Sequence, residues 1–501
     1  MFFARGLLAS TLAAAFAHAR PNITSDYALY ASPDGHYFQT GDGKPFFWLA
    51  DTAWNLFGSL TFDETTTYFE DRAAKGFTVA LVVAINDRTM QPGQESGQVP
   101  FVDGDPANPN EVYWAYVDRV VELAWSYGIR LCMVPSWGSY THGNENQVGL
   151  FGTKETARPF GRFIGERYPY LPKTLVGDTD PWWVNKTGLK NAYAMGGVIP
   201  DFEPVDWRPV YDAMARGIVE GENSVIPETL KKYKPLISSH SQNQWFTGGP
   251  LALASSYFGA YDWLTFDTSQ SGHTDYPPNP PIPWWNARRG WEPAQLMFAV
   301  GETTKGKKRP AIDNEPHYEW RYNNAKGPQF WNTSDVRIGS WQTAFTGTAG
   351  ITYGQDMVMR FYRSEETTPT HGVPITWDQA IKLPGSGQMQ HIKNAILDRG
   401  TEAYFNRIPA QEIVQNNTGN NDQRIFATRD RNGAWIMVFT PTDAAFSVDI
   451  SRLKGTNVKA SWLNPLDGQD TPFDFSGTGT VKFTPPQATD HVDWTLLLEA
   501  A

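Results

Sequence analysis

The chain of 501 residues is too long for one ordinary hydrophobic core, so we expect a large domain and a smaller one. Hydrophobic residues make up 41% of the sequence and aromatic residues 14%, which indicates a globular protein. The net charge of −11 argues against nucleic acid and against an anionic membrane surface as partners. The single cysteine, Cys132, excludes an intrachain disulfide.

The first 19 residues have the features of a secretory signal peptide. Arg5 precedes an apolar stretch at residues 6–16, and Ala17-His18-Ala19 has the small-x-small pattern of a cleavage site. The apolar stretch is too short to span a membrane. Secretion to the extracellular space is therefore expected, and it agrees with four glycosylation triplets, which begin at Asn22, Asn185, Asn332 and Asn416.

Between residues 20 and 400, short apolar runs alternate with segments of helical pattern. A capping box at Thr61 and Glu64 predicts the start of one helix, and Asn110 begins another. Eight runs are predicted as strands, at residues 46–50, 77–85, 129–135, 191–198, 235–239, 261–266, 310–312 and 350–353. This alternation predicts an α/β fold, a (β/α)8 TIM barrel over residues 20–400, whose active site lies at the C-terminal strand ends.

The pattern changes after residue 400. Residues 401–423 are predicted as a polar connector, and residues 424–501 have an all-β pattern. Phe446, Val448 and Ile450 alternate with polar residues, as expected of a half-buried strand. We therefore expect a small C-terminal all-β sandwich packed on the barrel.

Glu315 is the first candidate for a catalytic carboxylate, because it directly follows the seventh predicted strand. The alternative is a solvated loop residue or a structural ion-pair partner. Glycoside hydrolysis needs two carboxyl groups on either side of one bond, and on a barrel they come from different strands. Composition does not choose the partner among the other carboxylates near strand ends, which are Asp51, Asp87, Asp201, Glu203, Asp267 and Asp356.

Further polar and aromatic residues after the strands are candidates for substrate binding: Asp51, Trp54, Trp137, His240, Gln270, His273 and Tyr353. Polar groups at such a barrel mouth usually contact a ligand or one another. Asp51 is equally suited to capping the following turn, and Trp137 and Tyr353 to packing. No cluster has zinc spacing and no phosphate-binding loop is present, so we expect neither a metal nor a cofactor.

Several blocks of sequence resemble the apiosidase-like family, glycoside hydrolase family 140, and they occur in the same order along nearly the whole mature chain. They are PFFWLADTAWNLF, RAAKGFTVALVVA, PNEVYWAYVDRVVELAWSYGIRLCMVPSWG, FGRFIGERY, TSQSGH, RPAIDNEPHYE, SDVRIGSWQTAFTGTAGITYG and LPGSGQM. The C-terminal blocks WLNPLDGQ, FTPP and DWTLLLE resemble the collagen-binding-type β-domain usually attached to this family. The resemblance implies a secreted, retaining barrel glycosidase that acts on apiose-containing side chains of the pectin rhamnogalacturonan II.

The resemblance also implies catalytic residues. Glu315 matches the family's catalytic glutamate on the seventh strand. The family's second carboxylate is an Asp that ends a Gly-Gly-Asp motif after the fourth strand, and we align that motif with Gly196-Gly197-Val198. Because Val cannot transfer a proton, we expect Asp201, three residues on, to serve as the acid, with Glu203 behind it.

Two alternatives to Asp201 stay open. A more distant carboxylate such as Asp51 or Asp267 could take its place, or the chain could be a non-hydrolytic carbohydrate-binding protein on a glycosidase scaffold. An extracellular-matrix adhesion protein would instead place its ligand surface on the C-terminal domain. The aromatic residues and carboxylates at the strand ends favour a polysaccharide or oligosaccharide partner, and a monomer is expected.

Overall fold

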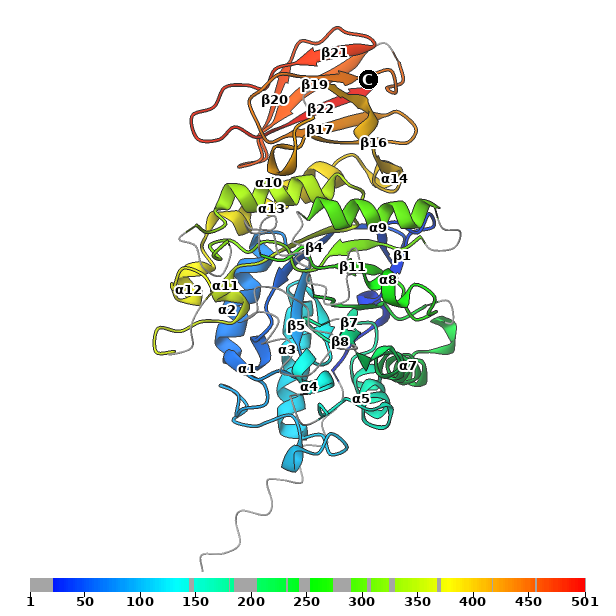
Figure 1. The fold of residues 1–501 in the computed structure, drawn as a ribbon, viewed down its shortest axis with the longest axis vertical. Helices are drawn as coiled ribbons and strands as arrows, with labels where there is room; N and C mark the ends of the chain where they lie inside the picture. Colours follow the sequence, from blue (N-terminus) through cyan, green and yellow to red (C-terminus); the bar gives the residue numbers. More distant parts are fainter. Residues whose placement is uncertain are drawn as a thin grey trace, which may run out of the picture.

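The structure is a computed structural model that describes residues 21–143, 148–179, 181–183, 205–230, 233–242, 253–273, 290–303, 308–323, 329–366, 371–416, 418–455 and 457–500. Figure 1 shows a larger α/β unit with a smaller β-domain stacked on one side of it. The predicted signal peptide and the predicted strand at residues 191–198 lie outside these ranges.

Parallel strands form the centre of the α/β unit. A six-stranded parallel sheet has the order β10-β7-β6-β5-β4-β13, and β11 pairs with β12 in a separate parallel sheet. The strands are β4 (Trp48–Thr52), β5 (Val79–Val83), β6 (Arg130–Val134), β7 (Lys173–Leu175), β10 (Ile237–Ser239), β11 (Asp267–Ser269), β12 (Ala311–Asp313) and β13 (Gly350–Tyr353).

The two parallel sheets meet at two junctions, and at each of them a backbone hydrogen bond joins the chain segments where a continuous ladder of strand pairing would otherwise run. Thr265 N donates to Ile237 O and Ala349 N donates to Ala311 O, each at 3.0 Å. A side chain also accepts a backbone hydrogen bond at one junction, where Ile237 N donates to Thr265 Oγ1 at 2.8 Å. Within the described ranges, the expected barrel is therefore a six-stranded parallel sheet with a parallel pair beside it, rather than one continuous eight-stranded ladder.

Helices begin where the sequence predicts caps. Both halves of the Thr61–Glu64 capping box form at the start of α2 (Phe62–Ala74), and the Asn110 side chain accepts from Val112 N at the start of α3 (Glu111–Ser126). The other helices of ten or more residues are α5 (Lys154–Arg167), α7 (Arg208–Val225), α9 (Trp291–Thr303), α10 (Thr333–Ala344) and α13 (Pro384–Leu397). Shorter helices are α1 (Leu56–Ser59), α4 (Gly138–His142), α8 (Ala254–Phe258), α11 (Asp356–Met359), α12 (Trp377–Ala380) and α14 (Thr401–Phe405).

One strand was missed in the sequence, and one predicted strand is displaced. The strand after α5 is β7, which the sequence conceals because Lys173 and Thr174 interrupt any apolar run although both are buried. Residues 261–266 form turns instead of a strand, and β11 follows directly after them. The buried side chains of Trp263 and Leu264 produce the strand-like pattern there. The other six predicted parallel strands correspond to β4, β5, β6, β10, β12 and β13.

The C-terminal domain consists of two antiparallel sheets around one apolar core. The sheets have the orders β14-β16-β17-β22-β19-β20 and β15-β18-β21. Their strands are β14 (Arg407–Pro409), β15 (Val414–Asn416), β16 (Phe426–Asp430), β17 (Trp435–Thr440), β18 (Phe446–Asp449), β19 (Val458–Leu463), β20 (Asp470–Phe473), β21 (Thr480–Phe483) and β22 (Trp494–Ala500). The expected connector at residues 401–423 therefore contains α14, β14 and β15, and the two strands pair within this domain.

The β-domain is docked firmly on the α/β unit through α10 and α13, which lie beneath its larger sheet in Figure 1. Trp341 of α10 stacks on Phe439 of β17 with ring centroids 5.7 Å apart. Arg337 binds both oxygens of Asp493 at 2.8 and 2.7 Å, and both side chains are buried. Residues of the two units share one hydrophobic cluster, so the β-domain completes the core over α10.

Candidate active site

Glu315 lies just beyond the C-terminal end of β12, and its side chain is buried between two histidines. Nε2 of His240 lies 3.0 Å from Oε2 of Glu315, and Nε2 of His273 lies 2.8 Å from Oε1. A carboxylate only accepts hydrogen bonds, so both Nε2 atoms carry the proton. Asn314 Nδ2 donates to His240 Nδ1 at 2.9 Å, which orients the imidazole so that Nε2 faces Glu315.

This environment keeps Glu315 ionised. Burial alone raises the pKa of a carboxyl group, but the hydrogen bonds from His240 and His273 outweigh burial and hold the pKa of Glu315 well below its usual range. Burial and the charge of Arg321 lower the pKa of His273 to about 4, although Glu315 opposes them. At neutral pH, an anionic Glu315 therefore faces a neutral His273.

A second carboxyl group, Asp178, enters the site from the end of β7. Gln270 Nε2 donates to Asp178 Oδ1 at 3.3 Å. Burial, together with the negative charge of Glu315, raises the pKa of Asp178 to about 7. We did not select Asp178 from the sequence, although a Gly-Asp pair directly after a short strand would have been the signal for it.

Two tryptophans border the Glu315 site. The ring of Trp54 packs edge-on against His240 at 5.1 Å between centroids, and Trp137 lies 6.3 Å from the same imidazole. Both line a cavity of about 380 Å³, which is large enough for a sugar residue. The remaining lining residues are Asn55, Asn86, Asp87, Arg88, Gln91, Met359, Arg360, Glu366 and His371.

The structure brings together five of the predicted binding residues around Glu315, which are Trp54, Trp137, His240, Gln270 and His273. Asp51 differs from the prediction. Its side chain is fully buried, and its Oδ2 accepts from Arg72 Nε at 2.6 Å and from Tyr68 OH at 2.7 Å, both on α2. Asp51 therefore joins β4 to a helix instead of reaching substrate.

Tyr353 also differs from the prediction. It is fully buried at the end of β13, and its hydroxyl donates to Glu319 Oε2 at 2.5 Å. Glu319 in turn accepts from Gly385 N at 3.2 Å, so this contact ties the strand to α13. The direction of the side chain, which strand propensity does not encode, places both Asp51 and Tyr353 between the sheet and its helices.

The remaining carboxylate candidates separate clearly. Asp201 and Glu203 lie outside the described residues, as does Val198. Asp267 accepts from Ser255 N at 2.9 Å and so supports the start of α8, while Asp356 forms an ion pair with Arg321 at 2.5 Å. The carboxyl groups of Asp267 and Asp356 are therefore both engaged by other groups of the protein.

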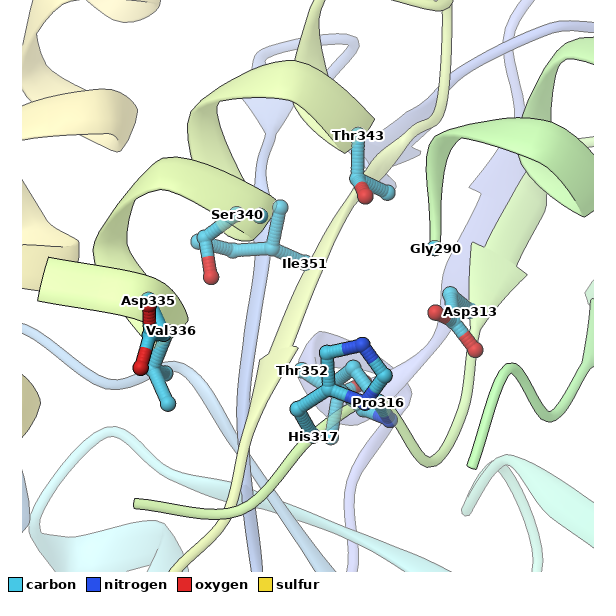
Figure 2. A pocket seen from close by; sticks show the side chains of 11 residues that line it. Gly290, Asp313, Pro316, His317, Asp335, Val336, Ser340, Thr343, Ile351 and Thr352 are labelled. Carbon is cyan, nitrogen blue, oxygen red and sulfur yellow. The ribbon is translucent and has the colours of Figure 1, made fainter. Parts of the chain in front are cut away.

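A smaller cavity of about 20 Å³ lies behind the site, between β12, β13 and α10. Figure 2 shows the Asp313 carboxyl beside Gly290 and across the cavity from Ser340 of α10. Ser271 binds both oxygens of Asp313, from N at 3.0 Å and from Oγ at 2.6 Å, and burial raises the pKa of Asp313 to about 7. The volume suits about one water molecule, so no sugar can enter.

Among the residues that the structure describes, no three His, Cys, Asp or Glu side chains are placed to hold a metal ion. None of the helices in this part of the chain combines the length and apolar character that crossing a bilayer requires.

Comparison with solved structures gives the class of protein, a glycoside hydrolase. A structure described as a glycoside hydrolase is 26% identical, covers 95% of this chain and 97% of its own, and superposes with a TM-score of 0.76. A glycoside hydrolase family 5 structure from Bacteroides vulgatus ATCC 8482 has 24% identity, covers 94% and 93% of the two chains and has a TM-score of 0.75. The second likeness shows the fold alone.

The chain belongs to the apiosidase-like family, whose catalytic-domain model matches residues 32–402. A second model, described as "putative collagen-binding domain of a collagenase", matches residues 408–499. This match begins near β14, in agreement with the strand pairing of the β-domain. No curated protein matches the chain.

Proposed function

We propose that this protein is a retaining glycosidase with Glu315 as the nucleophile and Asp178 as the general acid and base. One observation carries the proposal: the same site lowers the pKa of Glu315 and raises that of Asp178 to about 7. Two carboxyl groups whose pKa values are driven apart can serve as an anion and a proton donor at the same pH.

The reaction then has two steps. The Glu315 carboxylate forms a bond to the anomeric carbon while the glycosidic bond breaks, and the Asp178 proton passes to the departing oxygen. In the second step, water attacks the anomeric carbon, its proton passes to Asp178, and the bond to Glu315 breaks. His240 and His273 stabilise the returning carboxylate through the hydrogen bonds they already donate.

Asp178 takes the role that we first gave to Asp201. The strand before the second carboxylate is β7, and Val176-Gly177-Asp178 follows it at the position where the family has Gly-Gly-Asp. The proposal therefore places that motif 20 residues before Gly196-Gly197-Val198, which lie outside the described residues. The purely carbohydrate-binding alternative rested on Val198, so this position supports hydrolysis instead.

For the substrate, we propose apiose-containing side chains of plant pectin, which the family membership supports. Export follows from the predicted signal peptide at residues 1–19 and would bring the enzyme to the plant cell wall. We further propose that the two parallel sheets act as one eight-stranded barrel, with the two carboxylates delivered by its fourth and seventh strands.

The test compares the wild-type protein with Glu315→Gln and Asp178→Asn on rhamnogalacturonan II side-chain fragments. We expect loss of reducing-sugar release by about 10³-fold or more for Glu315→Gln and about 10²–10⁴-fold for Asp178→Asn. Asp490→Asn, which alters an exposed carboxylate of the β-domain, is the matched control and should keep full activity.

Azide distinguishes the two roles. On 2,4-dinitrophenyl apioside, whose dinitrophenolate departs without a proton, Asp178→Ala should still form the glycosyl-enzyme and leaves room for a small anion. Azide can then attack the glycosyl-enzyme directly, so it should restore turnover and yield a glycosyl azide. It should not restore Glu315→Gln, which forms no covalent intermediate. Binding of the fragments by a wild-type protein that releases no sugar from them would contradict the proposal.

A further inference from the structure

The backbone around Asp178 has an unusual conformation. Val176 has a φ of +27° and Asp178 a φ of +54°, in the region that residues with a side chain rarely adopt. Such a conformation costs about 1–3 kcal/mol per residue and persists only where neighbouring groups hold it. The groups that hold residues 176–179 therefore decide where the Asp178 carboxyl points.

On one side of Asp178, the loop that follows β6 holds Gly177. Gly177 N donates to Ser136 O and Gly138 N donates to Gly177 O, both at 2.9 Å. A Cβ atom at Gly177 would overlap the ring of Trp137, so only glycine permits this close approach. The backbone just before Asp178 is therefore joined to the start of α4.

On the other side of Asp178, a buried chain of hydrogen bonds holds Thr179. Thr179 Oγ1 lies 2.9 Å from the hydroxyl of Tyr211, and that hydroxyl lies 3.1 Å from Nε2 of His142. The three side chains come from the Asp178 loop, from α7 and from the last residue of α4. Because α4 also begins at Gly138, the two sets of contacts hold Asp178 against the same short helix.

The hydrogen-bonded side chains of Thr179, Tyr211 and His142 keep one protonation state across the pH range in which the enzyme would work. Burial lowers the pKa of His142 to about 3, so its imidazole is neutral at pH 5–8. The ring is stacked on Trp207 with centroids 4.8 Å apart and planes 11° apart, which leaves it little freedom to turn. The hydrogen bonds can therefore act as a fixed support.

We propose that Tyr211 and His142 are positioning residues for Asp178, acting through Thr179 to aim its carboxyl at the departing oxygen. This inference rests on the proposed function, because it assumes that Asp178 donates a proton. A positioning role lowers kcat/KM, which reports the first step, mainly for substrates whose leaving group needs this proton, whereas general loss of structure lowers kcat/KM for every substrate alike.

The dependence on leaving group separates these possibilities. The phenol of phenyl apioside must be protonated as its glycosidic bond breaks. The leaving group of 2,4-dinitrophenyl apioside is a stable anion, which departs without a proton. For Tyr211→Phe and Thr179→Val, we expect kcat/KM on the phenyl substrate to fall about 10–100-fold, which is less than the ~10²–10⁴-fold typical of losing the proton donor itself. On the dinitrophenyl substrate, kcat/KM should fall less than about 3-fold. The pair of variants guards against a folding failure of either one.

Tyr233→Phe is the matched control. Tyr233 is also buried and interacts with Glu222 of α7, and its ring packs against Tyr30 and Tyr170. Its loss should change the rates on both substrates in parallel. Thermal unfolding of all three variants checks that each is folded at the assay temperature.

A second measurement is the pH profile of kcat/KM on the phenyl substrate. If Tyr211→Phe releases Asp178 towards solvent, the basic limb should move to lower pH, towards the ordinary range of a carboxyl group. Equal losses on both substrates with an unmoved basic limb would overturn the inference and leave the proposed function intact. Failure of the wild-type protein on both apiosides and on pectin fragments would overturn the two together.

Discussion

His240 donates a hydrogen bond from Nε2 to Oε2 of Glu315 at 3.0 Å, and its other nitrogen accepts from Asn314. The imidazole is fully buried, and the rings of Trp54 and Trp137 lie near it. One histidine thus connects the anionic carboxylate to the aromatic wall of the larger cavity. Its removal should affect the charge of Glu315 before it affects sugar binding.

We therefore expect His240→Ala to raise the pKa of Glu315, because one of the hydrogen bonds that lower it is lost. The acid limb of the kcat/KM profile should move to higher pH, and the maximum rate should fall about 10²-fold. Steady-state kinetics between pH 3 and 9 measure both changes. His391→Gln, which alters a histidine of α13 packed against Gly468, is the control and should leave the acid limb in place. An unmoved acid limb in His240→Ala would show that His240 does not hold Glu315 ionised.

The wild-type profile should itself be bell-shaped. The acid limb reflects protonation of Glu315 well below its usual range, and the basic limb reflects loss of the Asp178 proton near pH 7. With an activated aryl apioside, Asp178→Asn should abolish the basic limb, since asparagine does not titrate. A basic limb that survives this substitution would assign the proton donor to another group.

Asp178 should also affect stability. Its folded-state pKa of about 7 lies above the value of an unfolded aspartate, near 3.9, so the folded state binds the extra proton. Folding is consequently disfavoured by Asp178 as the pH rises from about 4 to about 7. Asp178→Asn should stabilise the protein by about 1–3 kcal/mol at pH 8 and much less at pH 4. Thermal unfolding at the two pH values tests the sign, and an equal change at both would contradict it.

Substitution of Asp51 should lower the stability of the protein and leave substrate binding nearly unchanged. Asp51→Asn removes the fully buried one of the two carboxylates that pair with Arg72, the other being Asp71, so we expect a loss of about 2–4 kcal/mol in the free energy of unfolding. KM should stay within about 2-fold of the wild-type value, because Asp51 lies on the helix-facing side of β4. Denaturant unfolding and steady-state kinetics measure the two quantities. A large rise in KM with unchanged stability would restore the original assignment of Asp51 to substrate binding.

Local sequence patterns were sufficient for much of the fold. Mostly apolar runs predicted β5, β6 and β13, and the Thr61–Glu64 capping box predicted the start of α2. These features depend on neighbours only a few residues away, so they can be recognised in the sequence without the tertiary structure. Glu315 was also recognisable, because it directly follows an apolar strand and lies within a block that resembles the family.

The second carboxylate was decided only by the tertiary structure. β7 is three residues long and begins with Lys173, whose buried charge is met by Glu222 of α7, 49 residues away. No local pattern marks such a strand, and its position determines that Asp178 enters the site. Likewise, Arg72 of α2 determines that Asp51 is structural. The sequence by itself determined which groups could do the chemistry, and long-range contacts decided which of them meet, because a carboxyl group takes its pKa and its role from the charges packed around it.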